Sequence, residues 1–174
     1  GKKGGAWMTE YKEQWIKNGK NSRPHISIVM NFTPPTDSTP SLLTFDELTT
    51  LLHEFGHALH GMLSQTTYSS LSGTNVYRDF VELPSQILEN WATEKEFLDQ
   101  FAQHYITGEK IPQEYITKIK EAENFNVGYA CVRQLSFCFL DMAWHTLENP
   151  FEGNVKDFET KAWQQTLLFP TIEG

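Results

Sequence analysis

This sequence of 174 residues is short of long apolar runs, of basic charge and of cysteine. Its most apolar segment, residues 125–144, contains Arg133 and Asp141, so we expect no membrane-spanning helix and no membrane partner. Lys and Arg number 14 against 22 Asp and Glu, which gives a formal charge of −8 and argues against a nucleic-acid partner. Neither an initiator Met nor an apolar signal segment is present at the start, so we expect a piece of a longer protein.

The two cysteines, Cys131 and Cys138, lie seven residues apart within one predicted helix. Their Cα atoms would be about 10 Å apart there, which is beyond the reach of a disulfide. We therefore expect buried thiols in a reducing compartment, the cytoplasm, with the periplasm as the alternative.

Hydrophobic residues make up 39% of the chain and aromatic residues 13%, which is typical of a globular protein. Apolar residues recur every three or four positions over 45–63, and Thr44 with Glu47 forms a capping box, so a helix is predicted there. Alternating polarity predicts a strand over 25–32, with a second short strand within 4–11. Further helices are predicted from residue 79 or 80 and over 95–107, 113–122, 124–147 and 155–168. The fold class expected is mainly α, with a short N-terminal antiparallel β element.

The strongest chemical signal is the segment His53-Glu54-Phe55-Gly56-His57 inside the first predicted helix. Residues four apart lie one turn apart on one face, so both imidazoles can bind one zinc ion. Glu54 is offset by about 100°, from where its carboxylate can take a proton from a metal-bound water. Glycine costs about 1 kcal/mol relative to alanine within a helix, so Gly56 indicates close approach of a backbone or ligand. The motif predicts metal-assisted hydrolysis, and the alternative is a pair of ordinary polar histidines.

A catalytic zinc usually has a third protein ligand, which these spacings leave open. His60 lies about 4.5 Å further along the helix axis than His57, so we expect it to pack nearby or to contact the ligands rather than the metal. Glu82 and Glu89 fall on one face of the next predicted helix, and spacing does not choose between them. The full set of acidic candidates is Asp79, Glu82, Glu89 and Glu94.

Several motifs follow one another in a fixed order along the chain. They are HEFGHALH at 53–60, SGTN at 72–75, DFVELPSQ at 79–86 and ENW at 89–91. With these motifs the chain closely resembles the thimet oligopeptidase family of zinc metallopeptidases over nearly its whole length. The segments GGAWM at 4–8 and TPP at 33–35 are most similar to the bacterial peptidyl-dipeptidase, or dipeptidyl carboxypeptidase, branch.

The resemblance implies one zinc ion held by His53, His57 and Glu82, with Glu54 as the general base. It also implies a helical, zincin-like fold in which short peptides enter a deep channel. The chain would then be a catalytic-region fragment. Its parts would be a β element and connector at 1–40, zinc-site helices at 41–107 and supporting helices at 108–174.

Residues near these ligands are expected to orient them or to contact substrate. Gln86 or Glu89 is expected to orient a ligating imidazole. His60 and the loop residues Ser72, Gly73 and Thr74 are candidates for contacts with the ligands or with substrate. Family members continue past residue 174 into a segment rich in Gly and Tyr, whose Tyr and His residues are thought to bind substrate and stabilise the oxyanion. We therefore expect the fragment to keep the metal site and to have little activity.

The expected function is zinc-dependent hydrolysis of short peptides that releases C-terminal dipeptides. Two alternatives stay open, an endo-acting oligopeptidase and a helical zinc-binding module without catalysis. The helix predicted at 124–147 is apolar on most of its surface and should be buried on several sides. If its cover belongs to a longer protein, exposed patches would favour self-association of the fragment.

Overall fold

The computed structural model describes residues 2–169, which are mostly helical with short antiparallel strands near the N-terminus. These residues separate into two units between Thr117 and Lys118. The helix α5 (Gln113–Asn124) crosses that division. This architecture confirms the expected fold class of a mainly α chain with an N-terminal β element.

The first unit begins with two antiparallel strand pairs. The strands β1 (Trp7–Lys12) and β4 (His25–Val29) pair with Trp7 opposite Val29, so the predicted strand ends three residues earlier than residue 32. A second pair, β2 (Trp15–Lys17) and β3 (Lys20–Ser22), was not predicted. Its turn places Asn18 at φ 52° and Gly19 at φ 72°, the left-handed conformations that an Asn-Gly hairpin turn requires. The Asn18-Gly19 pair is the sequence signal for this hairpin.

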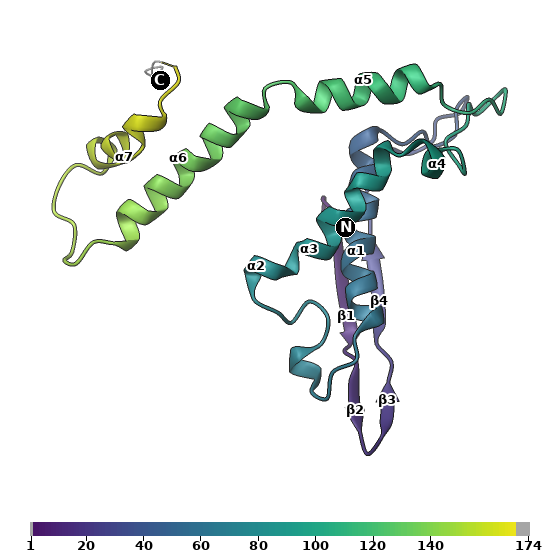
Figure 1. Ribbon diagram of the computed structural model, residues 1–174, viewed down its shortest axis with the longest axis horizontal. Helices are drawn as coiled ribbons and strands as arrows, with labels where there is room; N and C mark the ends of the chain where they lie inside the picture. Colours follow the sequence, from purple (N-terminus) through teal and green to yellow (C-terminus); the bar gives the residue numbers. More distant parts are fainter. Residues whose placement is uncertain (1, 170–174) are drawn as a thin grey trace. The chain divides into compact units, whose positions relative to one another are not determined.

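The helix α1 (Phe45–Leu63) runs alongside β1 and β4, as Figure 1 shows. It begins where the sequence predicts. The Glu47 backbone N–H donates to the Thr44 hydroxyl at 3.1 Å, and the Thr44 N–H donates to the Glu47 carboxylate at 2.8 Å. Both bonds of the capping box are therefore present, and they fix the first turn of the helix that carries the histidines.

A short 3-10 turn, η1 (Ser69–Leu71), precedes the helices α2 (Arg78–Val81) and α3 (Leu83–Glu89). The single helix predicted from residue 79 or 80 is thus divided at Glu82. Pro84 has no N–H to donate to the carbonyl of residue 80, so the first helix ends and a second begins with Pro84 in its first turn. Glu82 occupies the joint.

The helix predicted over 95–107 is wrong beyond its first turn. After the 3-10 turn η2 (Asn90–Thr93), α4 covers only Lys95–Leu98. The chain then reverses at Gly108, which has φ 72°, so that Gln103 forms a β-bridge with Lys110. The Ile111 N–H donates to the Ala102 carbonyl at 3.0 Å, and this long-range pairing replaces further helical turns.

The second unit contains α6 (Val127–His145), α7 (Val155–Trp163) and the 3-10 turn η3 (Gln164–Thr166). The predicted helices at 124–147 and 155–168 are both longer than these. Asn126 is left-handed at φ 62°, which stops α6 from beginning earlier. The helices are held by a cluster of Trp144, Phe151 and Phe158, in which the Trp144 and Phe158 rings lie 4.3 Å apart.

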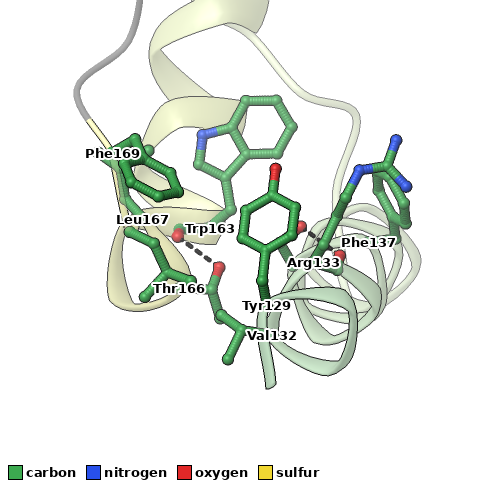
Figure 2. A pocket seen from close by; sticks show the side chains of 10 residues that line it. Tyr129, Val132, Arg133, Phe137, Trp163, Thr166, Leu167 and Phe169 are labelled. Carbon is green, nitrogen blue, oxygen red and sulfur yellow. Dashed lines mark hydrogen bonds between the residues drawn. The ribbon is translucent and has the colours of Figure 1, made fainter. Parts of the chain in front are cut away.

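The prediction that α6 is buried on several sides, with buried thiols, is wrong for the described residues. No residue of α6 is buried, and Cys131 and Cys138 are exposed free cysteines. Apolar periodicity reports which faces could be covered but not whether a neighbouring element covers them. A cavity of about 280 Å³ is lined by Tyr129 and Val132 of α6 and by Trp163. Figure 2 shows the side chains that line it. None of the helices within residues 2–169 has the length and apolar character needed to cross a membrane.

Candidate metal centre

Three side chains from separate parts of the first unit converge on one point. His53 and His57 come from α1, and Glu82 comes from the joint between α2 and α3. The Glu82 Oε2 atom lies 3.2 Å from Nε2 of His53 and 3.2 Å from Nε2 of His57. One donor atom from each residue lies within 4.8 Å of the others. Spacing left Glu82 and Glu89 open as third candidates, and the family resemblance implied Glu82. The geometry places Glu82 between the two imidazoles.

The Glu82 carboxylate oxygen lies close to the spacing that a tetrahedral zinc ion needs between neighbouring donors, with respect to each imidazole. Zn–N and Zn–O bonds of 2.0–2.2 Å require neighbouring donors about 3.3 to 3.5 Å apart. Charged N–H···O hydrogen bonds are shorter, about 2.7–2.9 Å, so the 3.2 Å separations match ligands better than a plain ion pair. The side chains of His57, His53 and Glu82 are 11%, 26% and 48% exposed, so the cluster is open on one side. Two nitrogens, one oxygen and an open side are what a catalytic zinc site uses.

Gly56 explains how α3 comes close enough to α1. A Cβ atom at this position would lie 2.5 Å from the Ser85 Cα and 2.6 Å from the Pro84 carbonyl oxygen. Real Cβ atoms do not approach backbone this closely, so only glycine allows the contact. The sequence-based expectation that a backbone approaches Gly56 is confirmed.

The Glu89 carboxylate lies on the opposite side of the His53 ring from Glu82. Its Oε1 atom is 2.6 Å from Nδ1 of His53. A carboxylate at this distance favours the proton on Nδ1 and leaves Nε2 with its lone pair toward Glu82. Of the two residues expected to orient an imidazole, Glu89 is in contact with one. Gln86 is exposed, and its carbonyl accepts a bond from the Asn90 side chain at 3.4 Å.

Glu54 follows His53 on α1 and is nearly enclosed, with 8% of its surface exposed. It is outside the cluster of three donors and adjoins it in the chain.

His60 lies one turn after His57 with its ring 6.0 Å from that of Phe80, in an edge-to-face contact. Burial, and then the neighbouring His57, lower the pKa of His60. His60 therefore packs beside the cluster without joining it.

The loop residues Ser72, Gly73 and Thr74 lie at the C-terminal end of α1. The Gly73 N–H donates to the Ser64 hydroxyl at 2.8 Å, and that hydroxyl donates to the His60 carbonyl at 2.8 Å. Ser72 is fully buried. These contacts anchor the loop to the end of the helix, and no contact described for residues 2–169 joins it to the three donor atoms.

Two buried polar residues near these elements were not identified from the sequence. Ser85 and Gln14 are both fully buried. The Gln14 side chain donates to the Thr66 carbonyl at 3.2 Å and accepts from the Thr66 N–H at 2.8 Å, which fixes the chain just after α1. Gln14 has no local signal, because its partner Thr66 is distant in sequence. Ser85 donates to Glu82 three residues earlier, and the Glu82-x-x-Ser85 spacing is the local signal that could have identified it.

A capped helix with two histidines one turn apart, and a glutamate from the next helices between them, defines a metallohydrolase type of centre. The chain belongs to peptidase family M3, a family of metallopeptidases, whose model matches residues 1–171.

Relatives of this chain include bacterial and eukaryotic peptidases. It is 46% identical over 162 residues to a dipeptidyl carboxypeptidase of Escherichia coli, with 92% of this chain and 24% of that protein covered. It is 41% identical over 163 residues to oligopeptidase A of Escherichia coli, with the same coverage of 92% and 24%. A thimet-like oligopeptidase of Dictyostelium discoideum is 40% identical over 159 residues, which cover 90% of this chain and 24% of that protein. The chain spans about a quarter of the length of these relatives.

Proposed function

We propose that this chain carries the zinc centre of a peptidase that hydrolyses short peptides and releases dipeptides from their C-termini. The observation that carries the proposal is the convergence of two imidazole nitrogens and one carboxylate oxygen within 4.8 Å of one another, with the oxygen 3.2 Å from each nitrogen. Dipeptide release is favoured by two dipeptidyl carboxypeptidases at 44% and 46% identity, against 41% and 42% for two oligopeptidases A. The activity proposed is that of the longer protein to which this chain would belong.

In the proposed site His53, His57 and Glu82 hold the zinc ion. A bound zinc ion supplies Lewis acidity, which polarises the scissile carbonyl and lowers the pKa of water. Glu89 keeps the His53 ring oriented through its 2.6 Å contact. Glu54 accepts a proton from the attacking water and passes it to the departing amine.

Zinc affinity should depend on pH in a way that follows from these donors. The two histidines bind metal only when neutral, and the glutamate binds only when ionised. We therefore expect affinity to fall as the pH drops through the histidine range, from about 7 to 5. A zinc titration that shows equal affinity at both ends of that range would contradict the proposed ligands.

The role of Glu54 is tested by Glu54→Gln in the full-length enzyme. The amide cannot take up a proton, so turnover of a short peptide should fall by at least about a hundredfold while the zinc content stays at one per chain. Glu96→Gln, on the exposed face of α4, is the matched control and should leave turnover unchanged. A Glu54→Gln enzyme with full turnover would exclude Glu54 as the general base.

Mass spectrometry of the products decides between dipeptide release and endo-acting cleavage. An enzyme that releases C-terminal dipeptides should cut a peptide with a free C-terminus and spare the same peptide when it is amidated. Equal cleavage of both would favour the oligopeptidase alternative. Zinc binding without turnover in the full-length protein would favour the non-catalytic module.

We further propose that residues 1–174 alone bind zinc with little turnover and self-associate through exposed apolar side chains such as Leu135 and Phe139 of α6. Sedimentation velocity at rising concentration tests the association.

The cytoplasm is the compartment proposed for the protein, with the periplasm as the alternative. Fractionation of cells with an antibody against the chain separates the two.

A further inference from the structure

We infer that Ser85 is a positioning residue that holds Glu82 in place for the metal, an inference that rests on the zinc site proposed above. Ser85 is on the first turn of α3, three residues after Glu82. It is completely buried, with 0% of its surface exposed. A buried hydroxyl must donate its hydrogen bond to a nearby protein acceptor, because water cannot reach it.

The Ser85 hydroxyl has two acceptors, and both belong to Glu82. Its Oγ lies 2.9 Å from the Glu82 carbonyl oxygen and 2.9 Å from Oε2 of the same residue. Oε2 is also the atom that lies 3.2 Å from both imidazole nitrogens. The hydroxyl therefore contacts the same carboxylate oxygen that faces the two histidines.

Glu82 needs such a contact because little else restrains it. Its side chain is 48% exposed and it lies in the joint between two short helices rather than within one. A glutamate side chain has several rotatable bonds, so an exposed one samples many positions unless a partner holds it. The bond from Ser85 restricts the carboxylate to the position that faces His53 and His57.

Ser85 is itself fixed relative to the helix that carries the histidines. Its Cα and backbone nitrogen lie 2.5 and 2.8 Å from where a Cβ of Gly56 would be, so the backbone of α3 rests directly on α1. Gly56 is one residue before His57. The contact between Gly56 and Ser85 therefore fixes where the Glu82 carboxylate lies relative to the two imidazoles.

A plain serine-to-carbonyl hydrogen bond within a helix is the simpler explanation, and the chain contains a control for it. Ser136 on α6 donates to the Arg133 carbonyl three residues earlier, at 2.6 Å, without any carboxylate. Ser136→Ala therefore removes the backbone bond alone, whereas Ser85→Ala removes the backbone bond and the bond to Glu82. A loss of zinc affinity in Ser85→Ala that Ser136→Ala does not share excludes a general effect of removing a serine-to-carbonyl bond from a helix.

The test measures zinc affinity by competition with a chromogenic chelator, together with the visible spectrum of the cobalt(II)-substituted protein. We expect Ser85→Ala to bind zinc about tenfold more weakly, as loss of a group that orients a ligand does. Its cobalt spectrum should shift because the carboxylate is no longer held. Ser85→Gly removes the same hydroxyl with a different effect on helix stability and should lose the same affinity. Ser136→Ala should match the unsubstituted protein in both measurements.

Each outcome separates this inference from the proposed function. One zinc per chain in the unsubstituted protein, with unchanged affinity and cobalt spectrum in Ser85→Ala, overturns the role of Ser85 and leaves the zinc site intact. An unsubstituted protein that binds no zinc overturns the proposed function and this inference with it. A tenfold loss in both Ser85 variants, with none in Ser136→Ala, supports the positioning role.

Discussion

Gly56→Ala tests whether the metal centre depends on direct backbone contact between α1 and α3. The added Cβ would lie 2.5 Å from the Ser85 Cα and 2.6 Å from the Pro84 oxygen. Carbon atoms in contact prefer about 3.5–4.0 Å, so α3 must withdraw by about 1 Å. Both obstacles are backbone atoms, which cannot rotate away as a side chain would.

The expected change in the free energy of unfolding of Gly56→Ala is the difference between two opposing effects. Alanine is favoured over glycine within a helix by about 1 kcal/mol. Overpacking against a fixed backbone costs about 3 kcal/mol at the upper end of its usual range. We therefore expect a net loss of about 2 kcal/mol in the free energy of unfolding. Ligand distances in metal sites tolerate about 0.2 Å, so a 1 Å withdrawal of Glu82 should weaken zinc binding more than tenfold.

The assay pairs urea unfolding, followed by circular dichroism, with chelator competition for zinc. Gly128→Ala on α6 is the matched control, because a Cβ there meets nothing within 4 Å. This control should unfold no more easily than the unsubstituted protein and should bind zinc equally well. A Gly56→Ala protein with the same free energy of unfolding and the same zinc affinity as the Gly128→Ala control would show that the metal centre does not depend on this contact.

Three further changes test other parts of the structure. Gln14→Leu leaves the Thr66 N–H without its 2.8 Å acceptor, so urea unfolding should show a loss of about 1–3 kcal/mol, and an unchanged midpoint would contradict that. Burial, and then the charge of Glu13, raise the pKa of Glu10, so its contribution to stability is largest below the ordinary glutamate pKa and is lost as the pH rises through the raised value. Glu10→Gln should abolish this part of the pH dependence in urea unfolding, and a profile identical to that of the unsubstituted protein would count against it. Glu89→Gln should weaken zinc binding about tenfold in chelator competition, because an amide orients the adjacent imidazole less strongly, and equal affinity would remove Glu89 from the site.

The sequence was most informative where structure depends on residues close together in the chain. The start of α1 is set by Thr44 and Glu47, which bond to each other across one turn. Helical geometry alone places His53 and His57 on one face of α1, and their ring centroids lie 4.8 Å apart. The Asn18-Gly19 turn was equally local and could have been predicted.

Helical periodicity did not distinguish Glu82 from Glu89. The family resemblance favoured Glu82, and the fold places the two carboxylates differently. Both lie on one face of the second helical segment, so periodicity treats them alike. In the structure they contact His53 from opposite sides, Glu82 at Nε2 and Glu89 at Nδ1. That arrangement depends on the contact at Gly56, which joins segments far apart in sequence. The short α4 has a similar cause, since the pairing of Gln103 with Lys110 overrides local helical preference.

The location of Glu82 between two helices has a consequence for how the polypeptide would respond to metal. His57 and Glu82 are 25 residues apart, so an ion shared by them would close a loop and restrict the unfolded chain much as a covalent cross-link does. The segment 64–81 lies inside that closed loop. Its resistance to proteases should therefore rise on metal loading, so that limited proteolysis would report occupancy without any chromophore.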